Sequence, residues 1–234
     1  MASNWLKSFW LSLDYRVRRG YAGARPDVIQ LISKAPSIVL DVGCGAGMTA
    51  MLIRNRFPNA LTYGIETDHE LCSQAMQNSE RVFEGSIDDT KIRSHVKDAG
   101  PYDLIICADV LEHLLNPAET LNQLTNMLTQ DGHIITSLPN VRHFSTFWHL
   151  GVRGTWPQHE RGIFDDTHLH FYTRRNIVSL CQSAGLELIQ EKRNMRILES
   201  GAWTMPAAKV FDFWPFRSFL TFQYLHLWIK RQRD

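Results

Sequence analysis

The chain has 234 residues, of which 44% are hydrophobic, 21% charged and 11% aromatic. This length and composition predict one large globular domain, or less readily two small ones, and exclude a disordered chain. Lys and Arg number 25 against 24 Asp and Glu, so the formal net charge is +1, and this near-neutral balance argues against a dedicated nucleic-acid binder.

The sequence predicts neither a transmembrane span nor a secretory signal. The apolar stretch at residues 5–13 is interrupted by Lys7, and a signal peptide would need a longer apolar region with a small-residue cleavage site. The aromatic stretch at 211–229 holds charged and polar residues, which a lipid-facing helix of about 20 residues would have to bury. The four cysteines form no CxxC pair, which favours reduced thiols and a cytoplasmic protein.

Short β-rich runs alternate with longer helical runs between residues 37 and about 191. Strands are predicted at 37–41, 61–66, 81–84, 102–108, 133–137, 186–192 and 219–229. Helices are predicted at 48–56, 68–78, 117–128 and 174–184. Asp68 is the expected N-cap of the second helix, Gly185 the C-cap of the fourth, and Asp131-Gly132 a turn. Strands separated by helices are typical of βαβ units and a parallel sheet.

A glycine-rich loop follows the first predicted strand, where the run from Val39 to Gly47 reads VLDVGCGAG. Glycines let the backbone turn tightly and let a ligand approach closely, and the next helix begins with unpaired N–H groups. The spacing is GxGxG. Dinucleotide enzymes use GxGxxG, whose last glycine would stand at Met48. No lysine of a P-loop follows, so a nucleoside-triphosphate loop is excluded.

This run resembles motif I of class I S-adenosylmethionine-dependent methyltransferases, and residues 102–113 resemble motif IV of that family together with the segment after it. The resemblance covers residues 37–192. It implies a Rossmann-like α/β fold with a seven-stranded, mostly parallel sheet flanked by helices, the last strand being antiparallel. It also implies S-adenosylmethionine as the cofactor and S-adenosylhomocysteine as its product.

In this family the glycine loop lies beneath the methionine portion of the cofactor, and Asp41 contacts the amino end. Glu66 stands where the family places an acid that accepts hydrogen bonds from both ribose hydroxyls, because a carboxylate supplies the acceptors that a vicinal diol needs. Residues 85–88 fall where the family reads adenine, but Ser86 replaces the usual acid, which leaves Asp88 or backbone carbonyls as alternatives. The cofactor-binding residues implied by the resemblance are Asp41, Gly43, Cys44, Gly45, Gly47, Glu66, Thr67, Ser86, Ile87, Asp109 and Val110.

Methyl transfer from a sulfonium is an in-line displacement, so the protein mainly aligns a nucleophile and excludes water. A hydroxyl acceptor also needs a base. Residues 137–143 and 165–173 resemble a subgroup that contains ubiquinone-biosynthesis O-methyltransferases and bacterial methyltransferases of glycan pathways, which has a Thr-His pair near the acceptor pocket. His168 is therefore the first candidate base, His143 the second and His113 the third. A purely structural role is the alternative for each.

The segment 140–173 interrupts the strand–helix alternation and is expected to form an insertion with short helices over the acceptor. An arginine there could pair an anionic group, and a tryptophan could stack on a ring; solvated charge and apolar packing are the alternatives. No metal is expected, because catechol-type enzymes carry acids after strands four and five, and residues 137–140 have none. The candidate substrate-binding residues are Asn140, Arg142, Trp156 and His170.

One domain is expected over residues 1–234. It comprises N-terminal helices at 1–36, a cofactor-binding half at 37–139, the insertion at 140–173, and a helix, strands and an aromatic lid at 174–234. The favoured function is methylation of a small molecule at oxygen, with a sugar-containing glycan precursor or a phenolic quinone precursor as the acceptor. A protein methyltransferase, a non-catalytic binding protein with this fold and a nicotinamide-dependent oxidoreductase are the alternatives. No nucleic-acid partner is expected, and a homodimer is left open.

Overall fold

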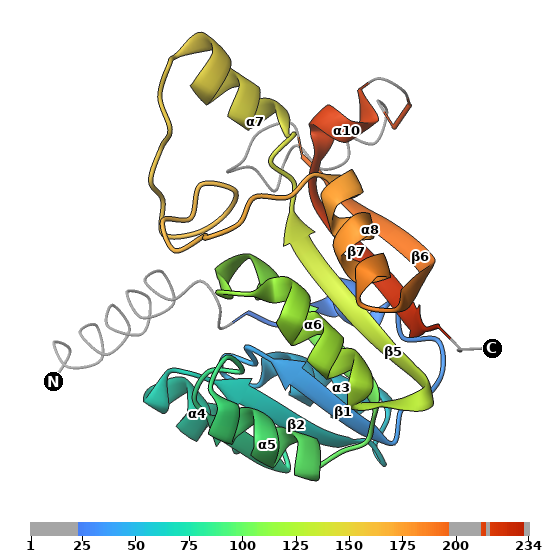
Figure 1. Cartoon of the computed structure of the whole chain (residues 1–234). Helices are drawn as coiled ribbons and strands as arrows, with labels where there is room; N and C mark the ends of the chain where they lie inside the picture. Colours follow the sequence, from blue (N-terminus) through green and yellow to red (C-terminus); the bar gives the residue numbers. More distant parts are fainter. Residues whose placement is uncertain (1–22, 197–211, 214–215, 232–234) are drawn as a thin grey trace, which may run out of the picture.

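The computed structural model describes residues 23–196, 212–213 and 216–231, and these form a central sheet with helices on both faces (Figure 1). The sheet has seven strands in the order β3-β2-β1-β4-β5-β7-β6. Strands β1 to β5 run parallel to one another, and β7 runs antiparallel to both β5 and β6. The strands are β1 (Ile38–Val42), β2 (Leu61–Glu66), β3 (Arg81–Glu84), β4 (Tyr102–Ala108), β5 (Leu128–Pro139), β6 (Leu186–Met195) and β7 (Thr221–Lys230).

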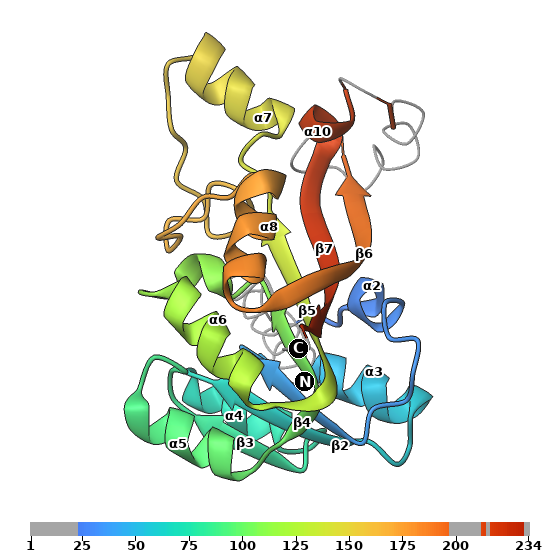
Figure 2. The ribbon, with the colours of Figure 1, turned by 45° about the vertical axis from the view of Figure 1, so that its right-hand side comes forward.

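The helices cover both faces of the sheet, which explains why the central strands are almost wholly apolar. Helices α5, α6 and α8 pack on one face through residues such as Val96, Leu121 and Ile177. Helices α2 and α3 pack on the other through Val28 and Ile53, and Figure 2 shows the two layers apart. The helices are α2 (Pro26–Ile29), α3 (Met48–Arg56), α4 (His69–Ala75), α5 (Thr90–Asp98), α6 (Pro117–Asn126), α7 (Phe144–Thr146), α8 (Arg174–Ser183) and α10 (Arg217–Leu220), with a 3-10 turn η1 (Leu111–His113) and a π-helical turn η2 (Phe147–Val152).

Most of the predicted elements are confirmed, and α3, β2, β3 and β4 have the predicted bounds. The carboxylate of Asp68 accepts hydrogen bonds from the amides of Glu70 and Leu71, both at 3.0 Å, and so caps α4 as expected. The antiparallel pairing of β6 with β7 is also confirmed. The predicted N-terminal helices begin before residue 23, and residues 1–22 lie outside the described part, as does Trp203 of the expected aromatic lid.

One sequence expectation is wrong, and one helix was not predicted. Asp131-Gly132 is not a turn, because β5 runs without a break from Leu128 to Pro139. Instead the register between β4 and β5 shifts here, so the Asp-Gly signal marks an irregularity within a strand. Helix α5 was not predicted, because Ile92 and Val96 are the only aliphatic residues in its polar sequence.

Within the described residues, no helix has the length and apolar character that a membrane crossing requires. The four cysteines are all buried and unpaired, as the sequence suggests.

Asp41 is a carboxylate buried at the carboxyl end of the central strand β1, with only 5% of its surface exposed. Burial raises its pKa to about 7, an effect that nearby Arg25 opposes and that Glu66 reinforces. Because an unfolded aspartate ionises near 3.8, the ligand-free fold retains a proton here that the unfolded chain loses. The fold therefore becomes less stable, relative to a chain without this group, as the pH rises from about 4 to 7.

The variant Asp41→Asn tests this coupling in the ligand-free protein. We expect the free energy of unfolding of the wild type to fall relative to the variant by roughly 2–4 kcal/mol between pH 4 and 7, because the variant has no carboxyl to ionise. Urea denaturation at pH 5 and pH 8 measures the difference. A gap between the two proteins that does not change with pH contradicts the assignment.

Candidate functional site

The loop between β1 and α3 is shaped by glycines in left-handed conformations. Gly43, Gly45 and Gly47 have φ values of 69°, 54° and 75°, which side chains other than glycine adopt only with strain. The amides of Gly43 and Cys44 both donate to the carbonyl of Ile65, at 2.8 and 2.9 Å. A Cβ atom at Gly47 would lie 2.9 Å from the Cα of Ala75. The loop is thus fixed between β2 and α4, close to the carboxyl edge of the sheet.

Glu66, at the end of β2, lies directly beside this loop. One carboxylate oxygen accepts from the amide of Gly45 at 2.9 Å. The other accepts from the amides of Thr67 and Asp68, at 2.7 and 3.0 Å, and from the Thr67 hydroxyl at 3.2 Å. Each carboxylate oxygen has about two lone-pair sites, so the oxygen that accepts from Gly45, which has no second donor among the described residues, keeps one site for a ligand hydroxyl. The structure therefore brings together the glycine loop and the acid that the sequence predicts as neighbours.

Hydrogen bonds within residues 85–88, and from them to α6 and Leu115, fix the conformation of the predicted adenine region. Ser86 Oγ accepts from the amide of Asp88 at 3.1 Å. The Asp88 carboxylate accepts from Thr120 Oγ1 and from the amide of Leu115, both at 3.1 Å. Asp88 therefore ties α6 to this loop, and Ile87 is 2% exposed. Contacts of Ser86 and Ile87 with adenine stay a prediction.

Arg25 is a site residue that the sequence analysis missed. Its guanidinium pairs with Asp109 and with Asp27, the latter at 3.0 Å, and donates to Ser137 Oγ at 2.8 Å. The second carboxylate oxygen of Asp109 accepts from the side chain of Gln223. Burial raises the pKa of Asp109, although Arg25 opposes the shift. A segment that precedes the sheet thus places a cation against the ends of β4 and β5.

Asp109 itself has an unusual backbone. Its φ of 59° is the only positive value at a non-glycine residue among those described. Such strain persists where surrounding contacts enforce it and is frequent at functional sites. Val110, next to it, packs against the glycine loop, since a Cβ at Gly43 would lie 2.7 Å from Val110 Cγ2. The predicted cofactor residues Asp109 and Val110 therefore lie beside the loop.

A cluster of Glu112, His113 and His168 lies just beyond β4. One nitrogen or oxygen atom of each residue lies within 4.8 Å of the corresponding atoms of the others. His168 Nε2 is 3.9 Å from Glu112 Oε1, and their side chains are only 4% and 1% exposed. Burial, together with Asp109, raises the pKa of Glu112 well above its ordinary value. Burial and His113 lower the pKa of His168.

The segment that carries His168 is docked onto the η1 turn. The amides of Leu169 and His170 donate to the carbonyl of Glu112, at 2.9 and 3.1 Å. The imidazole Nε2 of His170 lies 3.0 Å from the carbonyl of Leu114. The first and third candidate bases, His168 and His113, therefore lie together, and Glu112 is a partner that the sequence analysis did not single out.

Two other predicted site residues are engaged in structural contacts. His143 is 1% exposed, and its ring nitrogens contact Ser145 Oγ and the carbonyl of Arg196, both at 2.9 Å. Asn140 donates through Nδ2 to the carbonyls of Ser218 and Thr221, at 2.8 and 2.7 Å. Both groups anchor the end of β5, which favours the structural alternative for each of them.

The insertion carries the remaining predicted residues. Arg142 lies over the ring of Phe219, 4.8 Å from its centroid. Trp156 packs edge-on against Phe164 and Phe171, with centroid distances of 5.0 and 5.1 Å, and is still 40% exposed. Helix α7 projects away from the sheet (Figure 1), and the η2 turn that continues it has no buried residue.

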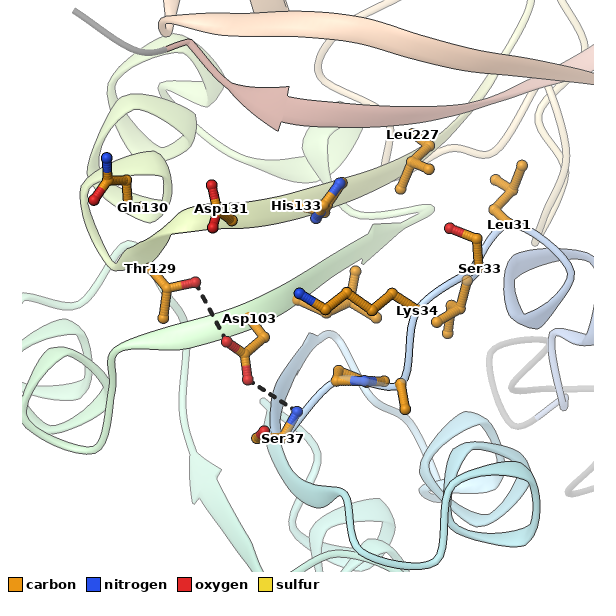
Figure 3. Close-up of a pocket in the computed structure, with 14 residues that line it drawn as sticks. Leu31, Ser33, Lys34, Ser37, Asp103, Thr129, Gln130, Asp131, His133 and Leu227 are labelled. Carbon is orange, nitrogen blue, oxygen red and sulfur yellow. Dashed lines mark hydrogen bonds between the residues drawn. The ribbon is translucent and has the colours of Figure 1, made fainter.

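A cavity of about 340 Å³ lies at the opposite edge of the sheet (Figure 3). Asp103 stands beside it and accepts from the amide of Ser37 at 2.9 Å and from Thr129 Oγ1 at 3.3 Å. These residues belong to the starts of β1, β4 and β5, whereas ligands of open parallel sheets bind at the carboxyl ends. The candidate site is therefore the edge that carries the glycine loop.

Comparison with known proteins finds relatives among the methyltransferases. A ubiquinone biosynthesis O-methyltransferase of Psychrobacter cryohalolentis is 28% identical over 144 residues, which are 58% of this chain and 53% of that protein. A trans-aconitate 2-methyltransferase of Pseudomonas aeruginosa is 29% identical over 112 residues, 48% and 39% of the two chains. The chain spans about half the length of the curated relatives it matches.

Solved structures share the fold across nearly the whole chain. An S-adenosylmethionine-dependent methyltransferase of Thermotoga maritima superposes with a TM-score of 0.59 at 14% identity, covering 98% of this chain and 96% of that one. The plantazolicin methyltransferase BpumL, in complex with S-adenosylhomocysteine, gives 0.57 at 18% identity, with 99% and 89% covered. The family model described as a methyltransferase domain matches residues 13–191. With this match over most of the sequence, on the fold of S-adenosylmethionine-dependent methyltransferases, the chain belongs to the methyltransferase domain family.

Proposed function

We propose that the chain transfers a methyl group from S-adenosylmethionine to a hydroxyl oxygen of a small molecule, either a phenolic quinone precursor or a sugar-containing glycan precursor. The observation that carries the proposal is one edge of the sheet at which the glycine loop, Glu66 and the Glu112–His113–His168 cluster all lie. Relatives named as O-methyltransferases, of ubiquinone biosynthesis and of malonyl-[acyl-carrier protein], support oxygen as the acceptor atom.

The residues at the loop fit the cofactor. S-adenosylmethionine supplies a methyl group that its sulfonium has already activated. The left-handed glycines leave room for a ligand against the backbone. The Glu66 oxygen that accepts from Gly45 keeps one acceptor site for a ribose hydroxyl, and the second ribose hydroxyl would replace the Thr67 hydroxyl on the other oxygen. Asp41 offers a carboxylate to an amino group, and Arg25 offers a guanidinium to a carboxylate. The amino-acid end of the cofactor carries both of these charged groups.

The acceptor side is the Glu112–His113–His168 cluster. Methyl transfer to a hydroxyl releases a proton, and a group beside the oxygen must receive it. His168 Nε2 lies 3.9 Å from Glu112 Oε1, so a proton taken up by the ring would favour the ionised form of Glu112 beside it. The side chains of His168 and Glu112 are only 4% and 1% exposed, which limits their contact with water, as methyl transfer requires.

The first test is calorimetric titration with S-adenosylhomocysteine. We expect micromolar binding to the wild type, at least tenfold weaker binding to Glu66→Ala because two charge-assisted hydrogen bonds to the ribose are lost, and no binding of NAD. Glu187→Ala, a substitution on the outer strand β6, is the matched control and should bind like the wild type. A folded protein that binds no S-adenosylhomocysteine would leave a non-catalytic binding role in place of the enzyme.

The role of Arg25 is tested by comparing two ligands. Arg25→Met should weaken S-adenosylhomocysteine binding by roughly 10- to 100-fold, because a charged hydrogen bond to its carboxylate is worth about 1.5–3 kcal/mol. Adenosine lacks that carboxylate, so its binding should not change. Arg175→Met, on the surface of α8, serves as the control variant. An equal loss for both ligands would mean that Arg25 only stabilises the fold around Asp109.

His168 is tested by turnover with hydroxylated phenols and glycans. His168→Ala should lower kcat by about 10²-fold or more while the Kd for S-adenosylhomocysteine stays constant, because the substitution removes a group on the acceptor side only. His95→Ala, on the outside of α5, is the matched control. If His168→Ala turns over as fast as the wild type, His168 is not the base.

A further inference from the structure

We propose that Glu112, His113 and His168 form a binding site for a divalent transition-metal cation such as Zn²⁺, Co²⁺ or Mn²⁺. The inference rests on the proposed function in one respect, since the cation would hold the acceptor oxygen next to the methyl donor. It revises the expectation from sequence that no metal takes part. That expectation considered only the acids after strands four and five, whereas His168 comes from the insertion.

The three side chains already lie close to coordination geometry. Their candidate ligand atoms all lie within 4.8 Å of one another, and His168 Nε2 is 3.9 Å from Glu112 Oε1. The rings of His113 and His168 meet edge to face with centroids 4.7 Å apart. Metal–ligand bonds of about 2.0–2.2 Å place ligand atoms roughly 3–4 Å apart. Small side-chain rotations would therefore close the set around one ion.

Glu112 supplies the second observation. It is 1% exposed, and neither of its carboxylate oxygens has a hydrogen-bond donor among the described residues. Burying a carboxyl group without a hydrogen-bond partner costs free energy of folding. Where such a group occurs in a native protein, it usually has a catalytic role or binds a water or an ion. The guanidinium of Arg25 pairs with Asp109 and Asp27 and not with Glu112. A cation between Glu112 and the two imidazoles would satisfy the carboxylate.

The surroundings of His113 set its ring for coordination. Its Nδ1 lies 3.3 Å from the carbonyl of Thr167 and 3.0 Å from the Thr167 hydroxyl, which itself donates to Asp165 at 2.5 Å. A carbonyl can only accept, and the hydroxyl proton is used on Asp165, so Nδ1 must carry the donated proton. In the neutral ring Nε2 then holds the lone pair. Metal-binding histidines are commonly oriented in this way by a hydrogen bond from the other ring nitrogen.

The ligand types select the class of cation. Two imidazoles and one carboxylate favour zinc, cobalt, manganese or iron in the divalent state, whereas magnesium and calcium prefer oxygen ligands. Three protein ligands leave coordination positions open. An acceptor hydroxyl bound there would ionise more readily, because a bound cation lowers the pKa of a coordinated oxygen acid. In the metal-bound protein the ring nitrogen of His168 coordinates the cation, so His168 is a ligand there instead of the base, and the proton of the acceptor hydroxyl passes to water.

The test uses the full chain, freed of metal by chelation and titrated with Co²⁺, whose visible absorption reports its coordination by nitrogen and oxygen. We expect one Co²⁺ per chain, displaced by Zn²⁺. Glu112→Gln and His168→Gln should each weaken binding by at least tenfold, with circular dichroism showing which variants fold. The control variants Glu119→Gln and His95→Gln should bind Co²⁺ like the wild type.

Failure of this inference is distinguishable from failure of the proposed function. The metal site is overturned if the protein does not bind Co²⁺ stoichiometrically. It is also overturned if both cluster variants fold and still bind Co²⁺ like the wild type. The proposed function survives that result if the metal-free protein binds S-adenosylhomocysteine and loses turnover in His168→Ala. Co²⁺ binding that depends on Glu112 and His168 supports the site, even where S-adenosylhomocysteine does not bind and the proposed function fails.

Discussion

Carboxylates with raised pKa values crowd the carboxyl edge of the sheet, and the rest of the site follows from that constraint. Asp41 and Glu112 are buried and Asp109 is half-buried, and burial raises the pKa of all three. Arg25 meets this excess of acid from outside the sheet, by pairing with Asp109. Burial is the main cause of each shift, so these acids ionise at a lower pH when a positively charged group lies next to them. A bound amino group, sulfonium or metal ion would supply that charge, and its binding would stabilise the fold by mass action.

The parts of the fold that sequence could predict are those whose signal is local. Helix α3 begins directly after Gly47 and ends before Pro58. Asp68 caps the next helix by accepting from the amide of Glu70, only two residues further along the chain. The start of β5 could not be predicted in this way. Its Asp-Gly pair has the composition of a turn, yet it lies in an irregularity of the strand, between Leu128 and His133, which both pair with β4. The pairing on both sides of the irregularity, and not the local composition, sets the start of the strand.

The site residues likewise fall into those with a local sequence signal and those without one. The glycine loop and Glu66 are recognisable because each ends a parallel strand, and adjacent parallel strands bring their ends together. Arg25 and Asp109 are 84 residues apart, and no local pattern links them. His143 was predicted as a candidate base because it follows strand five. In the structure its two ring nitrogens contact Ser145 and Arg196. Sequence places a residue at an edge, whereas its hydrogen-bond partners decide what remains for chemistry.

The acceptor side depends on a contact between two segments that are distant in sequence. Both the amide of Leu169 and that of His170 donate to a single carbonyl, that of Glu112, so the docking of the insertion and the position of the buried acid are the same event. The same two hydrogen bonds hold the segment that carries His168 next to Glu112. The neighbouring α7–η2 part of the insertion buries little, with Phe147 at 58% and Trp148 at 46% exposure. The insertion is therefore fixed at the segment around His168 and loosely packed in its outer part, as the proposed acceptor side would need in order to hold a base while admitting a substrate.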